Sequence, residues 1–80
     1  MNTNTTFKED LIAAGIPESA HMTLDLWSRA ACKQAPQRGL SDEEVIAFLP
    51  GDVDNNGVIL TPEQAAVVWK SAKRNICAQP

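Results

Sequence analysis

The sequence contains no long apolar run, and this absence excludes a transmembrane helix. The longest apolar stretches, residues 11–16 with Gly15 included and residues 65–69, fall far short of the roughly 18–20 residues that a membrane span requires. The N-terminal stretch MNTNTTFKED also lacks the basic start and the apolar segment of a secretory signal. These absences lead us to expect a cytoplasmic protein that does not associate with membranes.

Metal-binding and redox residues are equally scarce, because the chain has only two cysteines and one histidine. Cys32 and Cys77 have no CxxC spacing, and His21 has no second histidine to complete a zinc site. Both cysteines fall in apolar or small-residue stretches, where a free cysteine packs as a small hydrophobic side chain. We therefore expect both thiols to be reduced, with a disulfide between them as the alternative.

Positive charge is also in short supply, with seven Lys and Arg against ten Asp and Glu. Nucleic-acid binding needs clustered positive charge to displace counterions, so this class of protein is excluded. A catalytic site needs a nucleophile beside a base. The nearest candidates, Ser19 and His21, lie two residues apart on an expected helix and do not face each other. We therefore expect no enzymatic activity.

Eighty residues make one small domain, residues 1–80, with residues 1–6 as a polar and flexible lead. Ser and Thr caps, prolines and glycines divide the rest into four apolar-periodic segments. The expected helices run from residue 5 or 6 to residue 15, from 18 to 34, from 41 to 50 and from 62 to 77. The prediction is an all-α, compact bundle of about four short helices, with one loop of unusual composition between the third and the fourth.

Negative charge is concentrated around this loop. Six of the ten acidic residues lie in residues 39–63, which contain no Lys, Arg or His. The segment DVDNNGVILTPE carries oxygen-bearing side chains at its first, third, fifth and twelfth places and a glycine at its sixth. These residues are Asp52, Asp54, Asn56, Glu63 and Gly57. The pattern matches the D-x-[DN]-x-[DN]-G-x5-E calcium loop at every specified position.

The spacing suits a hard cation of calcium's size, which takes six to eight oxygens at about 2.3–2.6 Å. Gly57 supplies the positive φ that reverses the chain around the ion. Val58 would contribute its carbonyl oxygen, Glu63 both carboxylate oxygens, and a water would stand in at Leu60. The predicted calcium ligands are Asp52, Asp54, Asn56, Val58 and Glu63. The alternative is a solvated, Asx-rich turn followed by a well-capped helix.

Residues 48–69 resemble an EF-hand. Phe48 fits the aromatic residue of the helix that enters the loop, and Val67 and Val68 fit the apolar pair of the helix that leaves it. The resemblance implies a helix–loop–helix over residues 41–77 with Ca²⁺ as its ligand.

The segment departs from an EF-hand in two respects. Pro50 and Gly51 are expected to end the helix before the loop, a non-helical lead that is similar to the dockerin variety. The chain also shows no second loop, whereas dockerins carry two. A lone EF-hand has no partner for its short strand at Ile59, which favours a homodimer paired through that strand.

The sequence thus predicts a non-catalytic calcium-binding protein, in which the ion orders the loop and the last helix and modulates a surface for an unidentified protein partner. The alternative is a small adaptor or inhibitor, of the kind that phages and bacteria use against a macromolecular target, with a structural or vestigial loop. We expect Trp27 and Trp69 to lie in the core. Either tryptophan is also a candidate anchor for the partner.

Overall fold

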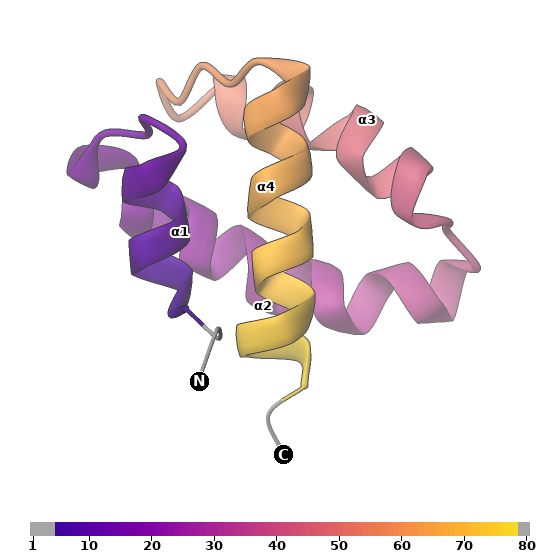
Figure 1. Ribbon diagram of the computed structural model, residues 1–80. Coiled ribbons are helices and arrows are strands. Elements are labelled where there is room, and N and C mark those ends of the chain that lie inside the picture. The colour runs from indigo at the N-terminus through magenta and orange to yellow at the C-terminus, as the bar shows by residue number, and fades with distance from the viewer. Residues whose placement is uncertain (1–4, 79–80) are drawn as a thin grey trace.

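Helices form where the sequence places a capped, apolar-periodic stretch, as Figure 1 shows for the computed structural model. The structure describes residues 5–78, so residues 1–4 of the expected flexible lead lie outside it. The elements are α1 (Phe7–Ala13), the 3₁₀ turn η1 (Glu18–Ala20), α2 (His21–Arg38), α3 (Asp42–Asp54), α4 (Pro62–Ala72) and the π-helical turn η2 (Lys73–Cys77). The described residues contain no β-strand, so the predicted all-α fold is confirmed. None of these helices is both long and apolar enough to cross a membrane.

Three helices begin with the same pair of reciprocal hydrogen bonds, the capping box. The hydroxyl of a Ser or Thr accepts from the backbone N–H three residues later, and the side chain of that later residue accepts from the cap's own N–H. The pairs are Thr6–Glu9 at α1, Ser41–Glu44 at α3 and Thr61–Gln64 at α4. The predicted starts at Ser41 and Thr61 are therefore confirmed, and each box satisfies N–H groups that a helix start leaves open.

Three helices also end in the same way, at a glycine with positive φ: Gly15 at 78°, Gly39 at 66° and Gly57 at 79°. In each case the N–H of the next residue donates to the carbonyl five residues before it. These bonds run from Ile16 to Leu11 at 3.0 Å, from Leu40 to Ala35 at 2.9 Å and from Val58 to Val53 at 3.3 Å. This is the Schellman motif, which ends a helix and brings together the two apolar side chains of the bonded residues.

Two helices run past the prolines that were expected to end them, so these predicted ends are wrong. The prolines are Pro36 in α2 and Pro50 in α3. Each removes a backbone hydrogen bond and crowds the preceding turn. In α3 the loss is offset because Val53, one turn beyond Leu49, continues the buried face of the helix into the core. As a result α3 includes Gly51 and the first three residues of the predicted calcium loop.

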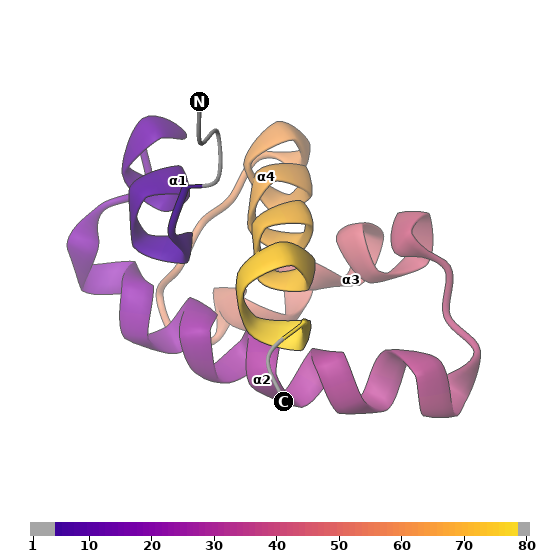
Figure 2. The same ribbon diagram turned by 60° about the horizontal axis from the view of Figure 1, so that its bottom comes forward.

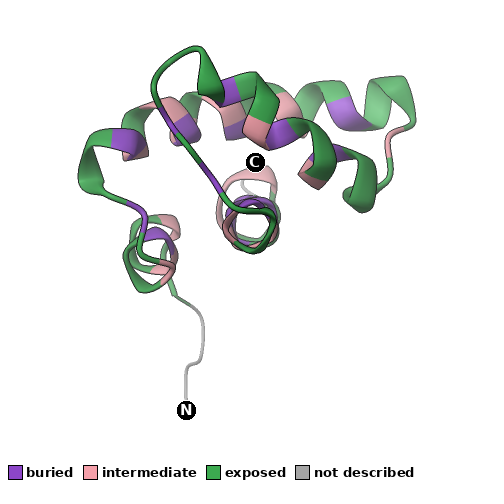
Figure 3. Ribbon diagram, turned by 90° about the horizontal axis from the view of Figure 1, so that it is seen from above, coloured by how far each residue is buried: buried purple, intermediate pink, exposed green. Residues whose placement is uncertain are grey.

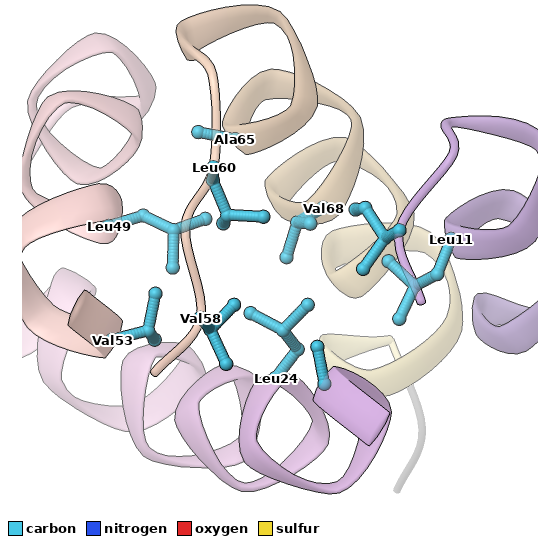
Figure 4. Close-up of a cluster of buried hydrophobic side chains, with 10 residues drawn as sticks. Leu11, Leu24, Leu49, Val53, Val58, Leu60, Ala65 and Val68 are labelled. Carbon is cyan, nitrogen blue, oxygen red and sulfur yellow. The ribbon is translucent and has the colours of Figure 1, made fainter. Parts of the chain in front are cut away.

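α4 lies at the centre of the molecule, with α1 on one side, α3 on the other and α2 crossing behind them (Figures 1 and 2). Figure 3, which looks down α4, shows buried residues on this helix and on the helices around it. The core of Figure 4 contains Leu11, Ile16, Ala20, Leu24, Leu49, Val53, Val58, Leu60, Ala65 and Val68. The Cα radius of gyration is 11.8 Å. A folded domain of this length is expected to have about 11.6 Å, so the predicted compact bundle is confirmed.

A disulfide between Cys32 and Cys77 joins the middle of α2 to η2, with 5.2 Å between the two Cα atoms. The expectation of reduced thiols is therefore wrong, and the alternative pairing is the one that forms. The two residues are 45 apart in the sequence and meet only because α2 packs against the C-terminal turn. None of the residues of η2 is fully buried. The bridge therefore holds this turn against α2, where the burial of side chains alone contributes little stability.

The two tryptophans meet edge to face, with ring centroids 5.8 Å apart and an interplanar angle of 78°. Trp69 is buried, as predicted for a core residue, and its Nε1–H donates to Asp42 Oδ1 at 3.0 Å. Lys73 Nζ approaches the other oxygen of Asp42 at 2.8 Å. The hydrogen bonds from Lys73 and Trp69 lower the pKa of Asp42 below its ordinary value. This cluster fixes the start of α3 against the end of α4.

A second polar cluster ties α1 to the last turns of the chain. Asp10 accepts hydrogen bonds from Ser71, from Thr5 and from Arg74. Burial by itself raises the pKa of Asp10, but these hydrogen bonds and the charge of Arg74 outweigh it, so the pKa is lowered from its ordinary value of 3.8. The docking of α1 on α4 therefore depends on an ionised carboxylate.

Candidate ion-binding loop

The predicted calcium loop lies where α3 leads into α4, at one end of the molecule (Figure 1). α3 ends at Asp54, residues 55–57 form a turn, residues 58–60 belong to no helix or strand, and Thr61 caps α4. Gly57 adopts the positive φ expected at the sixth place of the loop. The Schellman turn at the end of α3 requires the same φ, so the end of this helix accounts for the φ of Gly57 by itself.

The side chains predicted to share the ion lie on different sides of the loop. Asp52 and Asp54 are both in the last turn of α3, and residues two apart in a helix do not face each other. They line separate surface hollows, and Asn56 lines a third. Glu63 is exposed in the first turn of α4. Within residues 5–78 no three His, Cys, Asp or Glu side chains lie close enough to hold a metal ion.

The chemistry of these donors nevertheless fits a hard cation. Asp52, Asp54 and Glu63 form no ion pair in the described part of the chain, and residues 39–63 supply no basic residue to compensate them. Carboxylate and amide oxygens are the ligands that calcium prefers. The donor set therefore fits calcium in chemistry and in the reversal at Gly57. It fits in position only when the last turn of α3 unwinds and lets the two aspartates converge.

Segment 58–60 places two side chains in the core and one in solvent. Val58 and Leu60 are buried, whereas Ile59 is 76% exposed. No described residue pairs with this segment as a strand. Coordination by the carbonyl of Val58 and a homodimer paired through Ile59 both stay predictions.

Sequence reasoning missed one contact of the loop. The Nε1–H of Trp27 donates to Asp52 Oδ2 at 3.1 Å. The two residues are 25 apart in the sequence, so no short-range pattern signals the contact, and only the packing of α3 on α2 brings them together. The first residue of the predicted loop is thus tied to α2.

An open hollow, which we call the α2–α3 groove, lies between the helices that carry Trp27 and Asp52. It has a volume of about 440 Å³. The residues that line it include Trp27, Ala30, Ala31, Arg38, Phe48 and Asp52. Of the two tryptophans considered as partner anchors, Trp27 is partly exposed at this groove, whereas Trp69 is buried in the core.

Comparison with known protein families, with curated proteins and with solved structures finds no match for this chain. The roles of the loop and of the α2–α3 groove consequently depend on their own chemistry. That chemistry is a set of oxygen donors without ion pairs beside a hollow lined by both polar and apolar side chains.

Proposed function

We propose that this chain is a non-catalytic calcium-binding protein whose ion orders the loop and the start of α4. Asp52, Asp54, Asn56 and Glu63 would supply side-chain oxygens, and Val58 its carbonyl. The observation that supports this most directly is electrostatic. Three carboxylates in EF-hand spacing have no ion-pair partner among the described residues. A divalent ion offsets the repulsion that arises when the three converge.

Ion binding is coupled to the rest of the fold through α3. Because Asp52 and Asp54 do not face each other in a helix, the last turn of α3 must unwind before both reach one ion. Asp52 is hydrogen-bonded to Trp27 of α2, so this change reaches the α2–α3 groove. Calcium thereby modulates a surface for a protein partner. Unwinding the turn costs free energy, which reduces the affinity for calcium.

The disulfide indicates the kind of compartment in which the protein resides. Cytosolic reductants keep thiols reduced, so a bridge such as Cys32–Cys77 is typical of an oxidising compartment. The sequence led us to expect a cytoplasmic protein. Because of the disulfide, we propose an oxidising compartment instead. Calcium sites of extracellular modules have dissociation constants of about 10⁻⁴ to 10⁻³ M. A site that has to unwind a helical turn is suited to this range.

Calorimetric titration with calcium and then with magnesium tests the proposal. The wild-type protein is expected to bind a single Ca²⁺ and to prefer it to Mg²⁺, which demands a stricter geometry. Glu63→Gln removes one anionic ligand and is expected to weaken calcium binding at least about tenfold, or about 1.4 kcal/mol. The matched control is Glu43→Gln, which neutralises an acidic residue in the first turn of α3, outside the loop, and should leave the affinity unchanged. No heat at millimolar calcium, or equal weakening by both variants, would contradict the proposal.

A second candidate function is that of a small adaptor or inhibitor, with the loop structural or vestigial. The observation that favours it is the α2–α3 groove, an open hollow whose lining contains Asp52 but not the other predicted ion ligands. In this role calcium would at most raise the melting temperature by mass action and would leave the binding surface as it is. Target binding that is equal in calcium and in chelator would favour this candidate over the first.

A further inference from the structure

The α2–α3 groove is a hollow that the chain's own side chains leave open. Ala30 and Ala31 give it a wall of small residues on α2, and Trp27 and Phe48 add aromatic rings to its lining. Phe48 is 49% exposed, although the residue that follows it is fully buried. An aromatic ring left half in water beside a hollow of about 440 Å³ is apolar surface that a second molecule can cover.

The α3 wall of the groove carries one acidic residue, Asp52, one turn after Phe48. Glu44 lies one turn before Phe48 on the same face of the helix, next to the groove but outside its lining. Neither carboxylate has an ion-pair partner among residues 5–78. Arg38 is the one cation among the described residues that line the groove. The exposed ring of Phe48 is therefore flanked on both sides by carboxylates that form no ion pair among the described residues.

We propose that the α2–α3 groove binds a basic segment of another protein, which inserts a bulky apolar side chain beside Phe48 and places Lys or Arg near Glu44 and Asp52. The insertion removes the ring of Phe48 from water, and the complementary charges steer the encounter and fix its orientation. A second copy of this chain is a poorer occupant, because its own α3 wall carries the same negative charge. The surface goes beyond the proposed calcium site and does not require an ion.

Titration with two synthetic peptides tests the proposal. One peptide carries Leu and Lys in helical spacing, and the other carries Leu and Glu in the same order and length. The wild-type protein is expected to bind the Leu–Lys peptide at least about tenfold more tightly than the Leu–Glu peptide. The titration is done in chelator, so that its outcome does not depend on whether the loop binds calcium.

Two variants separate the groove from a general attraction between opposite charges. Phe48→Ser removes the half-exposed ring, and Ala30→Leu fills the groove from an exposed helical position. Each is expected to weaken the Leu–Lys peptide about tenfold. The matched control is Met22→Ser, which removes an apolar side chain that is 76% exposed elsewhere on α2 and should change the affinity by less than about twofold. Circular dichroism verifies that each variant is folded.

Equal binding of the two peptides would overturn the proposal, and so would equal weakening by Phe48→Ser and Met22→Ser. Unchanged affinity in both groove variants would overturn it as well. Self-association of the wild-type protein that is lost in Phe48→Ser would assign the groove to a second copy of the chain instead.

Discussion

The indole N–H of Trp27 donates to the carboxylate of Asp52 at 3.1 Å, so the residue that begins the predicted calcium loop is held by α2. The neighbouring Trp69 packs edge to face on Trp27, but its own N–H is bonded to Asp42. One of the two indoles therefore touches the loop directly and the other does not. This difference makes events at the loop measurable by fluorescence.

Calcium is expected to change the emission of Trp27 in a Trp69→Phe variant, because coordination by Asp52 disturbs the hydrogen bond from the indole. A fluorescence titration with calcium, reversed by chelator, measures the change. The control is Trp27→Phe, in which the emission of the remaining Trp69 should stay constant. A response of Trp69 without one of Trp27 would contradict the coupling between the loop and α2.

Two buried serines are expected to respond in opposite directions to alanine. The Ser28 hydroxyl has no hydrogen-bond partner in the described structure. Ser28→Ala should therefore raise the free energy of unfolding, by about 1 kcal/mol, because it removes an unsatisfied polar group. Ser71→Ala deprives Asp10 of a hydrogen-bond donor and should lower the free energy of unfolding by about 1–3 kcal/mol. Urea unfolding measures both values, and a loss of stability in Ser28→Ala would be the contrary result.

Removal of the disulfide is expected to lower the free energy of unfolding by about 2–4 kcal/mol, because the bridge restricts the unfolded chain. Thermal melts with and without reductant measure the effect in the wild-type protein. The Cys32→Ala/Cys77→Ala double variant is the control, since its melting temperature should not respond to reductant. Free thiols found in protein prepared without reductant would contradict both the bridge and the proposed oxidising compartment.

Asp10 is expected to make stability depend on acid pH. Its pKa in the folded protein lies below its ordinary value of 3.8. The carboxylate therefore contributes stability that is present above this value and is lost as the pH falls through the lower, folded pKa. Asp10→Asn should be less stable at neutral pH and should lose part of the acid dependence below about pH 4.

Asp25→Asn is the control for Asp10, because Asp25 is paired with Arg29 on the surface of α2. Such a pair contributes about 0.5 kcal/mol or less. Unfolding by urea at a series of pH values measures both variants. Identical pH profiles for Asp10→Asn and the wild-type protein would contradict the role of Asp10.

The starts of α3 and α4 were predictable from sequence because a cap is short-range chemistry, whereas α2, which has no side-chain cap, begins at His21 and not at the predicted residue 18. Ser41 and Thr61 each lie three residues from the side chain that completes their box. The ends at Pro36 and Pro50 were predicted wrongly. The sequence shows where a proline destabilises a helix, but it does not show which tertiary contacts compensate for that loss. That compensation includes the burial of Val53, which depends on the packing of the whole core.

The candidate site was only partly predictable, because its sequence is compatible with two structures. Asn56, Gly57 and Val58 fit an ion loop by their spacing, and they also fit the Schellman turn that ends α3. The choice between the two depends on tertiary packing and on the presence of an ion. No local sequence pattern predicts the contact of Trp27 with Asp52, because the two residues lie 25 apart in the sequence.

α3 and α4 both lie inside the covalent ring that the bridge between Cys32 and Cys77 closes. A protease that cuts once in this ring, for example at the exposed turn 55–57, opens it without releasing a fragment. The nicked molecule keeps its full mass apart from one added water, and it separates into two pieces only when the bridge is reduced. A cut at that turn would therefore leave both halves joined and able to remain packed on each other.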